Sequence, residues 1–420
     1  MCIITEFELE LCALYSNYVE HLKLTIMRKI IIISLTFIGY FGSLSAQKPE
    51  KIYSIAKVDK PHEYYVQQAE VWWKVIEKDK TNEEAWFNYY KANRYSLMTF
   101  KDIDRFDGHR NDGWVKESPY LKELDEIVDL IEKNIPNTFT YYRLKKMGYP
   151  SNETMFDALQ KAYKINPDNP DIYDSFVTYY EMSGDNSKRK EFDEKLYKAN
   201  EISSGFLAYG YNVLLTLKPN GIIMTFGDND TYPLWILQDA MNIRPDVIVV
   251  NVPLLTDSSY RKIIFKKLNV PNFSKEYKDG STTESEKEIV DYLIKNSSKT
   301  LSLYIGLPAW KQMKEYENNL YLVGLALEYS TENIDNIALL KNNFENNYAL
   351  DYIKNRFEYD MSASIVERMN INYLPGIFKL YEHYKLSGDL THAQKMKELG
   401  LLIAQKGGKE WYDKALAILK

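Results

Sequence analysis

We predict a mixed fold from the sequence, α/β plus all-α, in which helical hairpins flank a parallel-sheet domain on both sides. Two observations support this prediction. Apolar and aromatic residues recur at three- and four-residue spacing between Pro61 and Ser203, and the chain again reads as helical after Asn333. Between these two regions, short apolar runs of strand type alternate with helical patterns, which is typical of parallel sheets covered on both faces.

The length and composition favour a folded protein of several domains. A chain of 420 residues is too long for one ordinary core, and 45% hydrophobic with 27% charged residues is typical of globular proteins. We expect segments 1–46 (an N-terminal extension and signal peptide), 47–203 (helical), 204–332 (α/β) and 333–420 (helical). The net charge of −6 leaves no basic excess to neutralise phosphates, so nucleic acid is not the expected partner.

An export signal is predicted near the N-terminus. Met27-Arg28-Lys29 precede a short apolar run, Ile30–Phe41, and small residues lead to Ala46, where we place the cleavage site. The apolar run is shorter than the ~20 residues of a stable membrane span. We therefore expect a periplasmic or secreted protein with no membrane span after cleavage. The alternative is an uncleaved N-terminal anchor, and residues 1–26 are predicted to be an extension ahead of the true start.

Cleavage there would also remove every cysteine. Cys2 and Cys12, the two cysteines of the chain, both lie ahead of the predicted signal. The mature protein would then hold neither a disulfide nor a thiolate metal site, and it would have no cysteine nucleophile.

The first helical pair is predicted from a stripe of large apolar residues. Val66, Ala69, Trp73 and Ile76 have helical spacing, and a second stripe begins at Trp86. Asp79 and Asn82 interrupt the pattern between them. The sequence thus predicts two helices joined by a short turn.

Two further segments resemble tetratricopeptide repeats. In each, a small residue allows close helix approach, aromatic residues fill the facing groove, and a Gly-Asp pair makes the turn. The first segment contains Ala162, Pro167, Tyr173, Phe176, Tyr180 and Gly184-Asp185; the second contains Ile377, Leu380, Tyr381, Tyr384, Gly388-Asp389 and Ala393. The resemblance implies that the helices bind protein or peptide partners.

The predicted sheet is Rossmann-like, with continuous apolar strands and helices between them. The expected strands are Gly221–Phe226, Val247–Val252, Leu301–Ile305 and Tyr321–Leu327, and the expected helices are Pro233–Met241, Tyr260–Leu268 and Glu284–Lys295.

The segment from Phe226 to Trp235 is the strongest candidate for a functional site, because ligands of open α/β sheets bind beyond the carboxyl ends of the strands. In one interpretation Asp228 and Asp230 bind a divalent cation or form an acid/base pair. In another, Asp230 or Thr231 caps the next helix while Asp228 and Asn229 hold the turn. A neutral polar ligand such as a sugar is the third. The candidate ligand-binding residues are Gly227, Asp228, Asn229, Asp230, Thr231, Trp235, Gln238 and Asn251.

The same region carries a family resemblance. Tyr211-Asn212-Val213-Leu214, Gly227–Trp235, Arg244-Pro245-Asp246 and Gly324-Leu325-Ala326 fall in this region. Residues 205–330 resemble the soluble region of bacterial multi-pass membrane proteins of unknown function that are related to protein O-mannosyltransferases. The resemblance places sugar transfer in a membrane part that this chain lacks, so it implies an accessory role with a glycan or an acceptor protein, not transferase activity.

Other candidate sites are weaker. Asp102, Asp104, Asp107, His109 and Asp112 lack the spacing of an EF-hand loop and are expected to form a solvated loop. The remaining histidines show no zinc spacing, and neither a nucleophile elbow nor a phosphate-binding loop is present.

Two functions follow from these patterns. The first is an exported binding or scaffold protein with an α/β ligand-binding domain, accessory to protein glycosylation or envelope glycan handling. The second is a periplasmic metal-assisted hydrolase or sugar-processing enzyme that uses Asp228 and Asp230. The sequence favours the first, because it contains no recognisable catalytic set.

Overall fold

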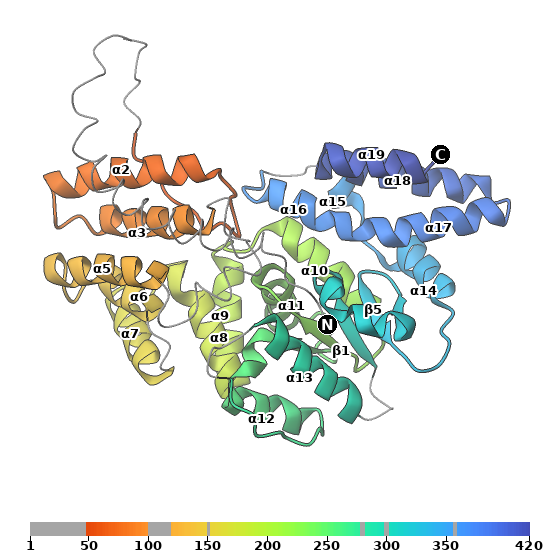
Figure 1. Cartoon of the computed structure of the whole chain (residues 1–420), viewed down its shortest axis with the longest axis horizontal. Coiled ribbons are helices and arrows are strands. Elements are labelled where there is room, and N and C mark those ends of the chain that lie inside the picture. Colours follow the sequence, from red (N-terminus) through yellow and green to blue (C-terminus); the bar gives the residue numbers. More distant parts are fainter. Residues whose placement is uncertain (1–47, 100–118, 149–151, 278–281, 298–301, 356–358) are drawn as a thin grey trace, which may run out of the picture. The chain divides into compact units, whose positions relative to one another are not determined.

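Helices dominate the part of the chain that the computed structural model describes, namely residues 48–99, 119–148, 152–277, 282–297, 302–355 and 359–420 (Figure 1). Residues Pro49–Lys420 form one compact unit. The predicted signal segment and the cluster from Asp102 to Asp112 lie outside the described residues. None of the described helices is both long enough and apolar enough to span a membrane.

Helical hairpins come first in this unit. The helices are α2 (His62–Lys78), α3 (Glu83–Met98), α5 (Pro119–Asn134), α6 (Phe139–Gly148), α7 (Asn152–Ile165), η1 (Pro170–Ile172), α8 (Tyr173–Ser183) and α9 (Asn186–Lys198). As predicted, α2 and α3 are separate helices, and the Asn82 side chain caps α3 by accepting from the Ala85 N–H.

The predicted stripe of α2 is confirmed at Ile76, which is buried, but it is off by one position at Val66 and Trp73. Val66 is 39% exposed, whereas its neighbour Tyr65 is buried. Trp72 is likewise buried while Trp73 is only partly so. The Tyr65–Trp72–Ile76 row brings more aromatic surface into the core with α3, which explains why that row faces inward.

The predicted Gly-Asp pairs both connect packed helices. Gly184 ends α8 in the left-handed conformation (φ 75°), and Asp185 caps α9 by accepting from the Lys188 N–H. Gly388 (φ 80°) and Asp389 do the same between α17 (Leu374–Leu386) and α18 (Leu390–Gly407). The helical hairpins are thus present, and the tetratricopeptide assignment stays a prediction.

A five-stranded sheet lies between the two groups of hairpins in the described chain. Its strand order is β2-β1-β3-β5-β4, and β1 (Ile222–Thr225) pairs in parallel with both β2 (Ile248–Asn251) and β3 (Leu303–Gly306). The remaining elements of this region are α10 (Ser204–Thr216), α11 (Asp228–Met241), η2 (Pro253–Thr256), α12 (Ser258–Lys267), α13 (Thr283–Asn296) and η3 (Leu307–Asn319).

The prediction of an all-parallel sheet is wrong at its last strand. The run Tyr321–Leu327 forms not one strand but a hairpin of β4 (Leu320–Leu322) and β5 (Ala326–Tyr329), and β5 pairs antiparallel with β3. Gly324, at φ 155°, lies in the turn between them. The sheet is therefore mixed, because the chain reverses direction without a crossover helix.

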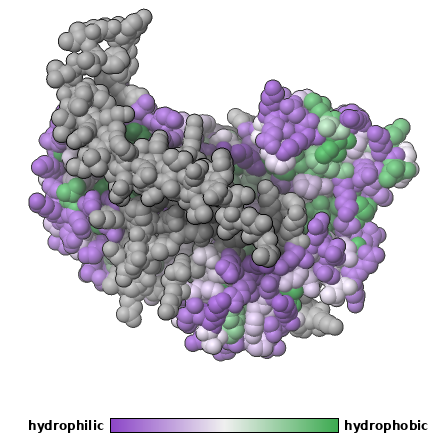
Figure 2. Space-filling model, in the orientation of Figure 1, coloured by the Kyte–Doolittle hydropathy of each residue, from purple (hydrophilic) through white to green (hydrophobic). Residues whose placement is uncertain are grey.

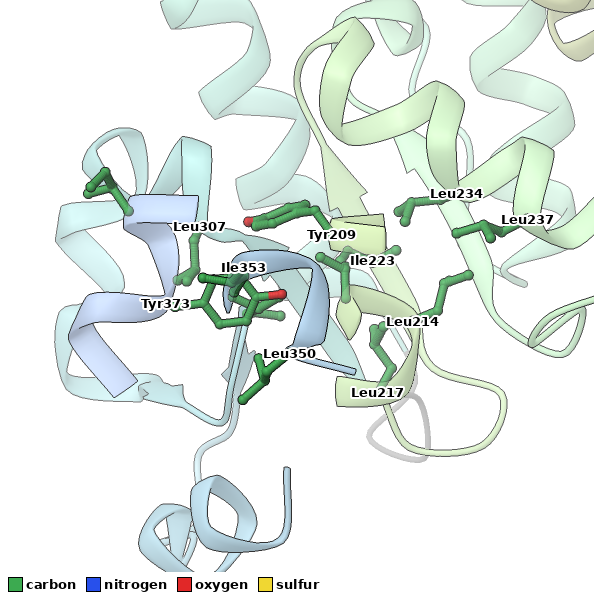
Figure 3. Packing of buried hydrophobic residues seen from close by; sticks show 14 of the residues in the cluster. Tyr209, Leu214, Leu217, Ile223, Leu234, Leu237, Leu307, Leu350, Ile353 and Tyr373 are labelled. Carbon is green, nitrogen blue, oxygen red and sulfur yellow. The ribbon is translucent and has the colours of Figure 1, made fainter. Parts of the chain in front are cut away.

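Alternate strand residues pack against different helices. Ile223 and Val249 belong to a core with α10 and α11, whereas Ile222, Met224 and Val250 belong to a second core with α12 and α13. Figure 3 shows Leu214 of α10 and Leu234 of α11 near Ile223, with Leu217 just after the end of α10. Each face of the sheet thus has its own pair of covering helices.

The first of these cores continues into the C-terminal helices, where Leu350, Ile353 and Tyr373 join it (Figure 3). The elements there are α14 (Asn336–Asn342), η4 (Asn343–Asn347), α15 (Asp351–Lys354), α16 (Ala363–Met369), η5 (Asn370–Tyr373), α17, α18 and α19 (Lys409–Ile418). The face drawn in Figure 2 is largely hydrophilic, with hydrophobic side chains gathered over the C-terminal helices.

Candidate functional site

The candidate segment forms the connection from β1 to α11. Helix α11 begins at Asp228, five residues before the predicted start at Pro233, so most of the candidate residues lie on the helix itself. Gly227 is the N-cap and is exposed together with Asp228, whereas Asn229 and Asp230 are partly buried. Gly227 and Asp228 therefore face solvent at the carboxyl end of β1, where ligands of open α/β sheets bind, and the helix becomes buried from Asn229 onward.

Asp230 binds the backbone that enters its own helix. Its Oδ1 accepts from the Gly227 N–H over 2.7 Å and its Oδ2 from the Phe226 N–H over 3.0 Å. Both carboxylate oxygens are thus used to join the end of β1 to the first turn of α11. This geometry is that of the capping interpretation, with Asp230 at the third helical position.

The environment of Asp230 also changes its acidity. Burial raises the pKa of Asp230 to about 6, although the hydrogen bonds from Phe226 and Gly227 act in the opposite direction and Asp228 adds a small rise. Gly306, at the end of β3, contributes to this burial, since a Cβ there would lie 3.7 Å from Asp230 Oδ2. Two adjacent strand ends therefore enclose the carboxylate.

Thr231 of α11 and Asn251 connect the end of β2 to the first turn of α11. Thr231 Oγ1 lies 2.6 Å from the Gly227 carbonyl oxygen and 2.7 Å from Thr225 Oγ1, and Asn251 Nδ2 donates to it over 3.0 Å. Asn251 Oδ1 in turn accepts from the Leu254 N–H. Both side chains are buried, so they hold β1, β2 and α11 together from inside.

The remaining candidates separate into one contact residue and two core residues. Asn229 Nδ2 donates to the carbonyl oxygen of Ala56 over 3.3 Å, which ties the segment before α2 to this loop. Trp235 is 1% exposed, so a ligand outside the protein does not reach it. Gln238 Nε2 donates to the carbonyl oxygens of Arg244 and Val247, both over 2.8 Å, and so holds the loop that enters β2.

Arg244 and Asp246 form a clamp that the sequence did not assign a role. The Arg244 guanidinium donates to the carbonyl oxygens of Leu214 and Leu217 and makes a bidentate ion pair with Asp246. Hydrogen bonds from Arg244 lower the pKa of Asp246 below its usual range. The Arg-Pro-Asp motif is thus accounted for by its hold on the end of α10.

Asp228 and Asp230 are not part of a larger cluster of metal-ligating side chains in the described residues. Within the residues that the structure describes, no three His, Cys, Asp or Glu side chains are grouped so that they could hold a metal ion. A divalent cation bound by Asp228 and Asp230 alone would take most of its ligands from water. The cation site stays an untested prediction.

Residues 206–376 match a domain family described as TMEM260-associated domain 2. That family is linked to TMEM260, which is related to protein O-mannosyltransferases, in agreement with the resemblance seen in the motifs. The match covers less than half of the chain, and it continues past β5 through η5 to the beginning of α17. No curated protein matches the chain.

Proposed function

We propose that this chain is an exported binding or scaffold protein, accessory to protein glycosylation or envelope glycan handling. In this proposal the tetratricopeptide-like hairpins bind protein or peptide partners. The Rossmann-like domain binds a neutral sugar at Gly227 and the first two residues of α11, Asp228 and Asn229. Exposed apolar side chains at the turn from α17 to α18, Leu386 (83% exposed) and Leu390 (69% exposed), support a protein-binding role for the hairpins.

The proposal rests on what the polar side chains at the sheet edge bind. Asp230, Thr231 and Asn251 hydrogen-bond to the backbone or to one another. A catalytic carboxylate needs an oxygen directed at the substrate, whereas both oxygens of Asp230 are directed at backbone N–H groups. The arrangement supports a rigid platform for binding more than a reactive centre.

Calorimetry and activity assays on the purified full chain test the proposal together. We expect α-1,3-mannobiose to bind, Asp228→Ala with Asn229→Ala to weaken that binding at least tenfold, and no glycoside or phosphoester to be turned over. Asp389→Ala at the cap of α18, in the C-terminal helices, serves as the matched control. Turnover that disappears in Asp230→Asn would overturn the proposal.

A metal-assisted hydrolase or sugar-processing enzyme is the second candidate. One observation favours it: a pKa of about 6 places Asp230 near the working range of a general acid or base. Titration calorimetry with MgCl₂, CaCl₂ and MnCl₂ separates the candidates. Cation binding that is lost in both Asp228→Ala and Asp230→Ala would favour the enzyme over the scaffold.

A further inference from the structure

A lysine without a carboxylate partner lies on α3, outside the matched domain. Lys91 is partly buried, and its Nζ lies 4.9 Å from the centre of the Phe87 ring, one helical turn earlier. Among the described residues, Lys91 makes neither an ion pair nor a hydrogen bond from Nζ. Phe87 stabilises the ammonium only through its ring face, which is weaker than an ion pair.

A second cation shares the same ring. The Arg143 guanidinium of α6 lies 4.0 Å from the Phe87 ring centre, and its side chain is 14% exposed. Arg143 Nη1 pairs with Asp171 Oδ2 at 3.2 Å and Nε donates to the Asp171 carbonyl oxygen, while Nη2 donates to no described residue. Asp171 therefore compensates the charge of Arg143, and Asp174 and Glu201 also stabilise it electrostatically. Lys91 is paired with none of the described carboxylates.

The surroundings of Lys91 disfavour its positive charge. Burial and the positive charge of Arg143 lower the pKa of Lys91 to about 7, and Lys51 and Lys57 lower it further against the opposing effect of Asp171. Lys57 has its own partner, Glu201. The ammonium of Lys91 would therefore gain from any anion that reached it.

The geometry points to a binding site for a single carboxylate group between Lys91 Nζ and the free edge of the Arg143 guanidinium, beside the Phe87 ring. The ligand class is a small monocarboxylate, such as a sugar acid. Carboxylate fits the fork of an arginine and matches the one uncompensated charge. A phosphate dianion would bring two negative charges next to Asp171, so it fits less well.

This inference is separate from the proposed function. Lys91 and Arg143 belong to α3 and α6, whereas the proposed sugar site belongs to the loop before α11. Failure of one site therefore leaves the other testable with its own variants.

Lysine side-chain NMR on the full chain, with ¹³C at Cε, tests the site directly. The Lys91 signal is assigned as the one missing in Lys91→Gln. We expect saturating sodium D-glucuronate or acetate to raise the Lys91 pKa from about 7 to about 8 or above, since tenfold tighter binding to the charged form corresponds to one pKa unit. Methyl α-D-glucoside, the neutral probe, should leave it unchanged.

One further variant, Arg143→Gln, and one internal control, Lys161, make the outcome decisive. Arg143→Gln should weaken glucuronate binding at least tenfold while leaving the Lys91 signal resolved. Lys161, which already pairs with Asp157 at 2.7 Å, should show no response to either carboxylate. The inference is overturned if the Lys91 signal ignores both carboxylates, if inorganic phosphate binds more tightly than they do, or if Lys161 responds equally.

Discussion

Asn212 of α10 and Tyr373 of η5 are joined by a buried hydrogen bond of 2.7 Å in which Asn212 Nδ2 donates to the tyrosine hydroxyl, although 161 residues separate them in the chain. Asn212 also bonds both backbone groups of Ala349, accepting from its N–H over 2.9 Å and donating to its carbonyl oxygen over 3.0 Å. One side chain therefore fastens the C-terminal segment to the helix that precedes β1. Both partners of this contact lie within the matched residues 206–376.

Replacing Asn212 should strongly destabilise the protein. Asn212→Ala removes three hydrogen bonds, two to the backbone of Ala349 and one to the buried Tyr373 hydroxyl, and we expect a loss of about 2–4 kcal/mol in the free energy of unfolding. Tyr373→Phe removes the hydroxyl that bonds to Asn212 and, over 3.1 Å, to Tyr352, and it should cost about 1–2 kcal/mol. Urea unfolding measures both; an Asn212→Ala loss no larger than that of Tyr373→Phe would contradict this account.

Asp230 should make stability fall as pH rises. Because its pKa is about 6 in the folded chain, against an ordinary value of 3.8 for an exposed aspartate, the folded state holds a proton between these values that the unfolded state has released. Stability is then fully present below about pH 4 and declines by about 1–3 kcal/mol up to about pH 6. Unfolding of wild type and Asp230→Asn at intervals from pH 4 to 7 measures the difference, which should show this slope. A flat difference between the two proteins would refute it.

Arg189 should contribute more to the free energy of unfolding than an exposed lysine or arginine does. It lies among the side chains of Glu181, Asp193 and Asp239, with a bidentate contact to Asp239 at 2.9 and 3.1 Å. Arg189→Met leaves these carboxylates without their cation, and we expect a loss of about 3–5 kcal/mol.

The neighbouring lysine provides a matched control. Lys188 pairs with Glu191 at the surface, and Lys188→Met should change the unfolding midpoint in urea very little. Similar losses for Arg189→Met and Lys188→Met would show that the buried ion cluster stabilises the fold no more than a surface ion pair does.

Gly324 should tolerate alanine less well than Gly388 does. Both have positive φ, 155° and 80°, but a Cβ on Gly324 would lie 2.1 Å from the Tyr348 hydroxyl, whereas nothing lies within 4 Å at Gly388. We expect Gly388→Ala to cost about 1 kcal/mol from backbone strain alone and Gly324→Ala about 2 kcal/mol more. Thermal unfolding of both variants measures this, and Tyr348→Phe should recover part of the Gly324→Ala loss. Equal losses at the two glycines would argue against the steric explanation.

The sequence predicted the positions of the strands better than it predicted their directions in the sheet. Ile248–Asn251 and Ile222–Thr225 lie in continuous apolar runs, which mark buried parallel strands. The hairpin at Gly324 was missed because apolar residues continue through its turn, and the isolated glycine was the one available signal.

The candidate site was predictable in its position but not in the roles of its residues. Glycine, aspartate and asparagine after a strand indicated the right loop. Whether Asp230 faces solvent or its own backbone depends on the path of α11, which composition does not determine. The sequence did not predict that Lys91 and Arg143 share the Phe87 ring, since α3 and α6 meet only in the folded chain.

The carboxylate of Asp230 has one more consequence for what this sheet edge can accept. The N–H groups at the start of α11 would attract a nucleotide phosphate, but the Asp230 carboxylate, bound to the preceding N–H groups of Phe226 and Gly227, already places a negative charge beside them. A tethered competitor acts at a high effective concentration, which a free anion must exceed to displace it. We therefore expect nucleotide phosphates to bind poorly at this sheet edge, in keeping with the neutral sugar that we propose as its ligand.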